Sequence, residues 1–154
     1  MESGKYRVRG TVRNKSDPAK LADLKEAFGE SYDNLELEEA DLMNAESLMS
    51  ALAGSTYVVH VASPFVMSGD RDSLVKPAVN GTTAVMKACH ATKVKRCVLT
   101  SSCVSVVYCA EEDRPIDNIF NEKHWSNPDA APCQSNAYLE SKTLAEKAAW
   151  DFVS

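Results

Sequence analysis

Several features that would each assign this sequence to a class of proteins are absent from it. It has no apolar run of membrane-spanning length and no apolar N-terminal region typical of a signal peptide. It has no C-x-x-C pair, its five cysteines are an odd number, and its three histidines lack metal-ligand spacing. Its net charge is −5, with acidic and basic residues interspersed. We therefore expect a cytoplasmic protein with reduced thiols, no metal, and neither nucleic acid nor membrane as a partner.

Glycine is sparse and poorly clustered. No two glycines are close enough to form the G-x-G-x-x-G turn by which doubly wound α/β proteins hold the pyrophosphate of a dinucleotide. Such a phosphate-binding loop is therefore absent from the sequence, not merely degenerate. The six glycines are Gly4, Gly10, Gly29, Gly54, Gly69 and Gly81.

The hydrophobic pattern switches repeatedly between the period of a strand and that of a helix. Residues 57–62 and 96–101 are apolar runs typical of strands buried on both faces, and residues 6–13 alternate. Strands that alternate with helices predict right-handed βαβ units and a Rossmann-like, doubly wound parallel sheet of the α/β class. Further predicted elements are a strand at 35–38 and helices at 21–28, 48–52 (capped by Asn44), 75–89 and 136–154.

Two groups of polar residues are candidates for chemistry. Tyr138 and Lys142 lie four apart, so both project from one face of the last predicted helix, where the ammonium lowers the pKa of the tyrosine. By spacing alone, a surface pair on an amphipathic helix is the more favoured interpretation. Ser101 and Ser102 follow a buried strand at the edge where open sheets bind ligands. Either hydroxyl could donate to a substrate oxygen or satisfy backbone groups at the strand end.

Arg13 ends the first predicted strand, where an enzyme that uses NAD carries an acidic residue for the ribose 2′-hydroxyl. An arginine there suits the 2′-phosphate of NADP instead, and Lys20 could join it. A solvated arginine in a polar loop is an equally good interpretation of the same position.

Longer motifs occur in a consistent order along nearly the whole chain. They are YRVRGTVRN at 6–14, ADL at 40–42, VVHVASP at 58–64, KPAVNGT at 76–82, VLTSS at 98–102 and YLESKTLAEKAAW at 138–150. With these motifs the chain resembles the dihydroflavonol 4-reductase/cinnamoyl-CoA reductase group of extended short-chain dehydrogenases/reductases, within the NAD-dependent epimerase/dehydratase superfamily. The resemblance implies an NADPH-dependent reductase of ketones or aldehydes, and residues 1–154 would form part of its NADP-binding Rossmann domain.

The resemblance also implies a role for individual residues. Tyr138 would be the general acid, Ser102 would steady the substrate oxygen, and Lys142 would hold the nicotinamide ribose and tune Tyr138. The cofactor would be NADP(H) and the substrate a small carbonyl compound or alcohol. The remaining implied cofactor contacts are Arg13 and Lys20 at the 2′-phosphate, Asp41 and Leu42 at the adenine, and Val61, Ala62 and Ser63 on the nicotinamide side.

The chain departs from the family pattern in ways that limit the prediction. The family's first strand and glycine-rich loop should precede Tyr6, and a substrate domain should follow the last helix, so we expect an inactive fragment. With the central strand missing, we expect strands 6–13 and 57–62 to pair directly. Flavonoid reductases usually have an asparagine five residues after the catalytic serine, where this chain has Val107. The polar segment 109–135 should line the substrate pocket, and its differences from the family leave the identity of the substrate undetermined. Alternatives are a hydroxysteroid dehydrogenase or nucleotide-sugar epimerase of the same superfamily, and a non-catalytic remnant or interaction module. The oligomeric state stays undetermined.

Overall fold

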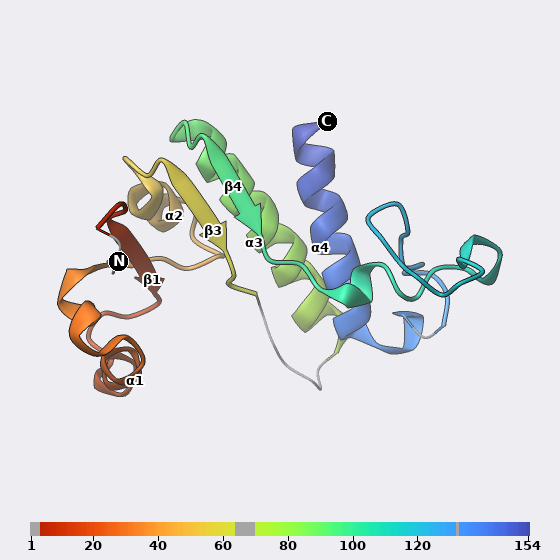
Figure 1. Ribbon diagram of the computed structural model, residues 1–154, viewed down its shortest axis with the longest axis horizontal. Coiled ribbons are helices and arrows are strands. Elements are labelled where there is room, and N and C mark those ends of the chain that lie inside the picture. Colours follow the sequence, from red (N-terminus) through yellow and green to blue (C-terminus); the bar gives the residue numbers. More distant parts are fainter. Residues whose placement is uncertain (1–3, 64–69, 132) are drawn as a thin grey trace.

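The computed structural model describes residues 4–63, 70–131 and 133–154, in which strands and helices alternate as the sequence predicts (Figure 1). The strands are β1 (Val8–Val12), β2 (Leu35–Glu39), β3 (Tyr57–His60) and β4 (Arg96–Leu99). The α-helices are α1 (Pro18–Phe28), α2 (Ala45–Leu52), α3 (Arg71–Ala91) and α4 (Ala137–Val153). Short 3₁₀ turns are η1 (Gly29–Asn34), η2 (Cys103–Ser105), η3 (Glu111–Asp113) and η4 (Cys133–Ser135).

Each α-helix begins at a side chain that accepts a hydrogen bond from the free backbone N–H groups of its first turn. Asn44 accepts from the Ser47 N–H at 3.0 Å, which confirms it as the cap of α2. Asn136 accepts from the Tyr138 N–H at 3.0 Å and so fixes where α4 begins. Asp17 and Asp70 do the same for α1 and α3. These capping residues, which lie between apolar segments, thus determine the residue at which each helix begins.

The strands form two parallel pairs that remain separate. β1 pairs with β2, placing Val8 opposite Leu35, and β3 pairs with β4, placing Tyr57 opposite Arg96. The order β2-β1 followed by β3-β4 is that of a doubly wound sheet on either side of its central strand. The predicted direct pairing of β1 with β3 is wrong, since the described residues contain no such ladder. A cavity of about 310 Å³ separates the two pairs, with Gly10 on one side and Val59 on the other.

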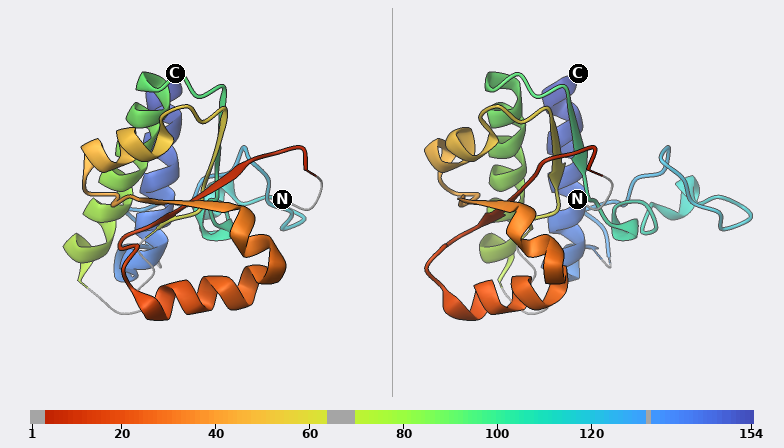
Figure 2. Two further views of the ribbon diagram at one scale, coloured as in Figure 1. Left: turned by 90° about the vertical axis from the view of Figure 1, so that its left-hand side faces the viewer. Right: turned by 60° about the vertical axis from the view of Figure 1, so that its left-hand side comes forward.

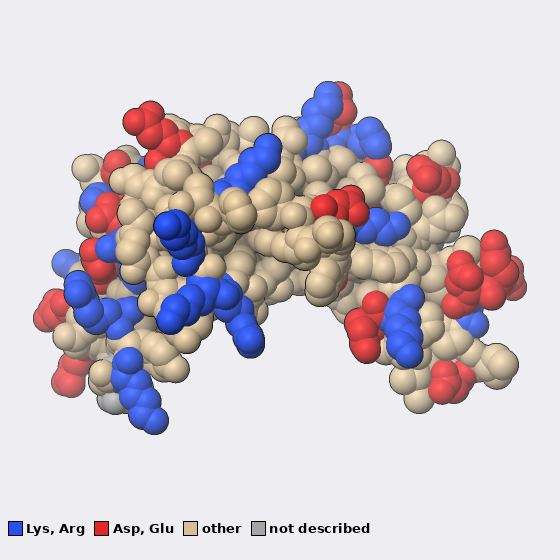
Figure 3. All heavy atoms as spheres, turned by 90° about the horizontal axis from the view of Figure 1, so that it is seen from above, with Lys and Arg blue, Asp and Glu red and all other residues tan. Residues whose placement is uncertain are grey.

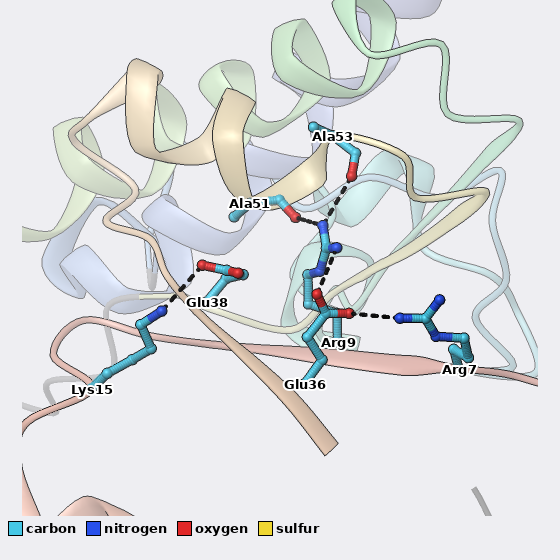
Figure 4. A network of polar contacts seen from close by, with 7 residues as sticks. All are labelled: Arg7, Arg9, Lys15, Glu36, Glu38, Ala51 and Ala53. Atoms are coloured by element: carbon cyan, nitrogen blue, oxygen red, sulfur yellow. Dashed lines mark hydrogen bonds and ion pairs between the residues drawn. The ribbon is translucent and has the colours of Figure 1, made fainter. Parts of the chain in front are cut away.

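Arg9 explains why β1 does not close onto β3. Its guanidinium donates to the carbonyl oxygens of Ala51 and Ala53, both at 2.9 Å, and to Glu36 Oε1 at 2.9 Å (Figure 4). A cation at the end of α2 satisfies carbonyl groups that the helix leaves unpaired. The hydrogen bond from Arg9 is the largest cause of a lowered pKa at Glu36. The first strand is therefore tied to α2, and the ladder edge of β3 is left uncovered.

The core lies between α2 and α3, on the side of the sheet where α4 also packs against α3 (Figures 1 and 2). Val58 and Cys97, from the two paired strands, pack against this cluster. Helix α1 contributes no buried residue and lies apart from these layers (Figure 2). The cluster consists of Leu48, Ala51, Leu52, Val85, Ala88 and Cys89.

Within the described ranges, no helix combines the length and the apolar composition needed to cross a bilayer. On the face drawn in Figure 3, both ends of the molecule carry basic and acidic side chains together. The predicted polar segment 109–135 extends away from the strands as turns and loops (Figure 1).

Candidate active site

The candidate site is built at the carboxyl ends of β3 and β4. The Thr100 N–H donates to the His60 carbonyl at 2.9 Å, so the two chains stay side by side beyond the last strand residues. Val61 to Ser63 therefore follow β3 next to the serines that follow β4. This is the edge at which open parallel sheets present polar groups to a ligand.

Helix α4 brings Lys142 to this edge. The Lys142 ammonium donates to Ser63 Oγ at 2.9 Å and lies 5.6 Å from the centre of the Tyr138 ring. Tyr138 and Lys142 therefore share one helix face, as their spacing predicts. Burial lowers the pKa of Lys142, because desolvation disfavours the charged amine. The resulting arrangement links a tyrosine, a partly desolvated lysine and the end of β3.

Ser102 begins the η2 turn. Its hydroxyl oxygen accepts the Val104 N–H at 3.4 Å, and α4 packs against this turn. The backbone-satisfying role that the sequence left open is thus present, and it leaves the Ser102 hydroxyl proton available to another acceptor. That Ser102, Tyr138 and Lys142 act on one substrate atom stays a prediction.

Glu146 is a site residue that the sequence analysis missed. The Ser101 hydroxyl donates to its carboxylate, and Ser101 also lies 3.3 Å from the Ser105 hydroxyl. Glu146 follows Lys142 by four residues, as Lys142 follows Tyr138, so helical spacing could have identified it. Ser101, the first serine of the pair, is therefore engaged in a different contact from Ser102. A cavity of about 20 Å³ lies among these groups, and His60, Ser63, Ser101, Lys142 and Glu146 form part of its lining.

His60 is buried at the end of β3, with 6% of its surface exposed. Burial is the main cause of a lowered pKa at His60, and the charge of Lys142 is the second. A histidine in an unfolded chain has a pKa near 6.5. Below that pH, His60 binds a proton more readily in the unfolded chain than in the folded chain, where its pKa is lower. His60 therefore destabilises the fold progressively as the pH falls through about 6.5.

We expect the urea midpoint to drop between pH 7.5 and 5.5, and the drop to shrink in His60→Gln. The matched control is His90→Gln, because His90 is exposed whereas His60 is buried. Urea titrations of the three chains at both pH values test this. An equal drop in the wild type and His60→Gln would contradict it.

The predicted 2′-phosphate contacts differ in their availability. Arg13 is exposed just beyond β1 and has no hydrogen bond or ion pair within the described part of the chain. Lys20 lies on α1 and makes an exposed ion pair with Asp23 at 3.4 Å. Arg13 is thus ready to receive an anion, whereas Lys20 would first have to leave Asp23. Their roles stay predictions.

Three of the other predicted cofactor contacts line the cavity between the two strand pairs. Leu42, Val61 and Ala62 line it, while Asp41 uses its carboxylate to accept the Met43 N–H at 2.8 Å. Leu42 also packs closely on α3, since a Cβ at Gly81 would lie 3.1 Å from the Leu42 Cβ. The absence of a side chain at Gly81 therefore allows Leu42 to line the cavity. Whether these residues contact a cofactor stays a prediction.

Comparison with known proteins identifies the family and agrees with the fold. The model of the 3-beta hydroxysteroid dehydrogenase/isomerase family matches residues 10–151. The chain belongs to this family. Its parallel strands and helices are therefore those of a Rossmann-like fold, in a family of oxidoreductases.

Several similar proteins are reductases. The chain is 40% identical over 151 residues to cinnamoyl-CoA reductase 1 of Petunia hybrida, covering 98% of this chain and 43% of that protein. It is 37% identical over 153 residues to an anthocyanidin reductase of Vitis vinifera, covering 96% and 44%. The crystal structure of yeast methylglyoxal/isovaleraldehyde reductase Gre2 with NADPH superimposes with a TM-score of 0.77 at 31% identity, covering 99% and 47%. The chain thus spans less than half the length of these relatives.

Proposed function

We propose that this chain carries the catalytic edge of an NADPH-dependent carbonyl reductase. The observation that carries the proposal is the position of Lys142, which lies over the Tyr138 ring and bonds Ser63 at the end of β3. The similarity to reductases, one of them solved with NADPH, supports the same reaction class. The substrate is a small ketone or aldehyde, or the corresponding alcohol in the reverse direction.

The residues fit the 2′-phosphate and the nicotinamide ribose at the two ends of NADPH, but the sequence offers no glycine-rich turn for the pyrophosphate between them. The Arg13 guanidinium, which has no side-chain partner among the described residues, suits a ribose 2′-phosphate. The Lys142 ammonium beside Ser63 suits the hydroxyls of the nicotinamide ribose. A pyrophosphate is normally held by backbone N–H groups of a glycine-rich turn at a helix N-terminus. The sequence contains no such turn. We infer weak cofactor binding by these residues alone.

NADPH, when bound, supplies the hydride that adds to the substrate carbonyl carbon. Tyr138 donates its phenolic proton to the carbonyl oxygen as negative charge develops there. The Lys142 ammonium, 5.6 Å from the centre of the Tyr138 ring, stabilises the negative charge of the tyrosinate that remains. Ser102 donates a hydrogen bond to the same oxygen and steadies the charge.

A hydroxysteroid dehydrogenase is the second candidate, because the matching family bears that name. The same proton transfer by Tyr138 would serve alcohol oxidation, so the edge residues alone do not separate the two. Arg13 favours NADP and so speaks against epimerases that use NAD. A non-catalytic remnant is the remaining alternative, favoured by the missing glycine turn.

The test compares this chain alone with a graft in which it replaces the aligned segment of the Petunia cinnamoyl-CoA reductase 1. We expect the chain alone to give no measurable NADPH-dependent turnover, since its sequence has no glycine-rich turn to hold the pyrophosphate. We expect the graft to oxidise NADPH with at least one carbonyl compound of a panel that includes cinnamoyl-CoA and methylglyoxal. Absorbance at 340 nm reports both.

Two results would overturn the proposal. One is a folded graft that binds NADPH and reduces no carbonyl compound of the panel. The other is vigorous turnover by the 154-residue chain alone, which would show that the pyrophosphate needs no glycine turn here.

A further inference from the structure

A partly buried ion pair joins the first residue of α3, Arg71, to the first turn of α4, which contains Glu140. Arg71 Nε lies 2.9 and 2.8 Å from the two carboxylate oxygens of Glu140, and Arg71 Nη2 lies 2.5 Å from Oε1. Only 6% of the Glu140 side chain is exposed, against 63% for Arg71. This forked geometry fixes both the distance and the orientation of the two groups.

Helix stability does not explain this pair. A cation in the first turn of α3 faces the positive end of the helix dipole, which is unfavourable for Arg71. Burying the Glu140 carboxylate requires its desolvation, which only a well-aligned partner offsets. By contrast, Lys76 and Asp72 on the same helix form an ordinary pair at 3.1 Å, with 67% and 64% of their side chains exposed. The Arg71–Glu140 pair therefore differs from an ordinary surface ion pair, because it joins two helices and buries one of its charges.

The pair lies where three segments meet. The pKa of Arg71 is raised chiefly by its hydrogen bond to Glu140, and also by Asp129 in the polar segment 109–135. The fully buried Cys133 thiol, which begins η4, has its pKa raised by burial and then by the charge of Glu140. The ion pair thus connects the start of α3, the end of the polar segment and the start of α4.

Glu140 lies midway between Tyr138 and Lys142 in the chain and points to the opposite side of α4, since two residues turn a helix by about 200°. Holding Glu140 to α3 therefore fixes the rotation of α4 about its axis and its position relative to α3. Both determine where the helix face with Tyr138 and Lys142 lies. A slip of this helix would withdraw the Lys142 ammonium from Ser63, which it reaches at 2.9 Å.

We infer that Arg71 and Glu140 are positioning residues, whose ion pair holds the first two turns of α4 so that Lys142 reaches Ser63 beside Tyr138. The catalytic meaning of this inference rests on the proposed function. The placement of Lys142 does not, because it can be measured in the 154-residue chain without cofactor or substrate.

The test is the pKa of the Lys142 amine, measured by NMR titration of the ¹³Cε signals and assigned with Lys142→Arg. In the wild type, burial holds this pKa below its ordinary value. In Glu140→Gln we expect it to rise toward about 10.4, the value of an exposed lysine. The sign is diagnostic, because loss of a nearby negative charge without movement of α4 would lower the pKa of Lys142.

Two further variants complete the design. Arg71→Lys keeps the charge but loses the fork, so we expect a smaller rise, and it serves in place of Glu140→Gln if that chain does not fold. Lys76→Met breaks the exposed pair on α3 and should leave Lys142 unchanged. An unchanged or lowered Lys142 pKa in folded Glu140→Gln or Arg71→Lys would overturn the inference. The experiment measures the pKa of Lys142 and no turnover. A chain that proved not to be a reductase could therefore still show the expected rise in this pKa.

Discussion

Replacing Tyr138 with phenylalanine should lower kcat of the graft by about two to four orders of magnitude, the usual contribution of a positioned general acid. Phenylalanine keeps the ring beneath the Lys142 ammonium, 5.6 Å from the ring centre, and removes only the hydroxyl. The fold and the binding of NADPH should therefore persist while proton donation to the carbonyl oxygen is lost. Steady-state NADPH oxidation, with a fluorescence titration of the cofactor, separates the two effects.

The chain supplies a matched control for this substitution. Lys25 lies 5.5 Å from the centre of the Tyr32 ring, nearly the same geometry, but close to α1 and away from the ends of β3 and β4. Tyr32→Phe should leave kcat unchanged. If Tyr138→Phe retains more than about a tenth of the wild-type kcat, another group donates the proton.

Arg13→Asp should reverse or abolish the preference of the graft for NADPH over NADH. A hydrogen bond to a charged group contributes about 1.5–3 kcal/mol, or roughly 10- to 150-fold in kcat/KM for NADPH. The new carboxylate also repels a 2′-phosphate and can accept a hydrogen bond from the 2′-hydroxyl of NADH. The measurement is the ratio of kcat/KM for the two cofactors, before and after the substitution.

Arg7 provides the control for a general loss of positive charge. It is 94% exposed near the start of β1, and its contact with Glu36 is long, at 3.8 Å. Arg7→Asp removes the same charge at the other end of that strand and should leave the cofactor ratio unchanged. An identical ratio in wild type and Arg13→Asp would show that Arg13 is a surface residue only.

Much of the fold could be predicted because local signals determine it. Asn44 and Asn136 mark the starts of α2 and α4, where their side chains accept the first free N–H groups. The apolar runs at 57–62 and 96–101 predicted β3 and β4, each of which ends two residues earlier in the structure. The period of the sequence thus identified each element, and the rule for parallel sheets ordered them.

The relation of the two strand pairs was not predictable from the same signals. Direct pairing of β1 with β3 was expected because unpaired ladder groups are costly. It fails because Arg9 bonds the Ala51 and Ala53 carbonyls, an interaction across more than 40 residues that leaves no periodic trace.

The candidate site shows the same division. The Tyr138–Lys142 pair follows from helical spacing, and Glu146, four residues further, was identifiable in the same way. The Arg71–Glu140 pair was not, because its members lie 69 residues apart and each looks like a surface charge in sequence. Likewise, only the three-dimensional structure shows that the two adjacent serines differ: Ser101 contacts Glu146, whereas Ser102 accepts the Val104 N–H.

The central claim is that Ser102 and Tyr138 act on one substrate oxygen, and a double-mutant cycle in the graft tests it most directly. The cycle compares kcat for Ser102→Ala, Tyr138→Phe and the double variant with that of the wild type. Residues that act as a unit are strongly non-additive, so we expect the double variant to be little slower than Tyr138→Phe alone. If the two losses multiply in full, the residues act independently and the proposed site is wrong.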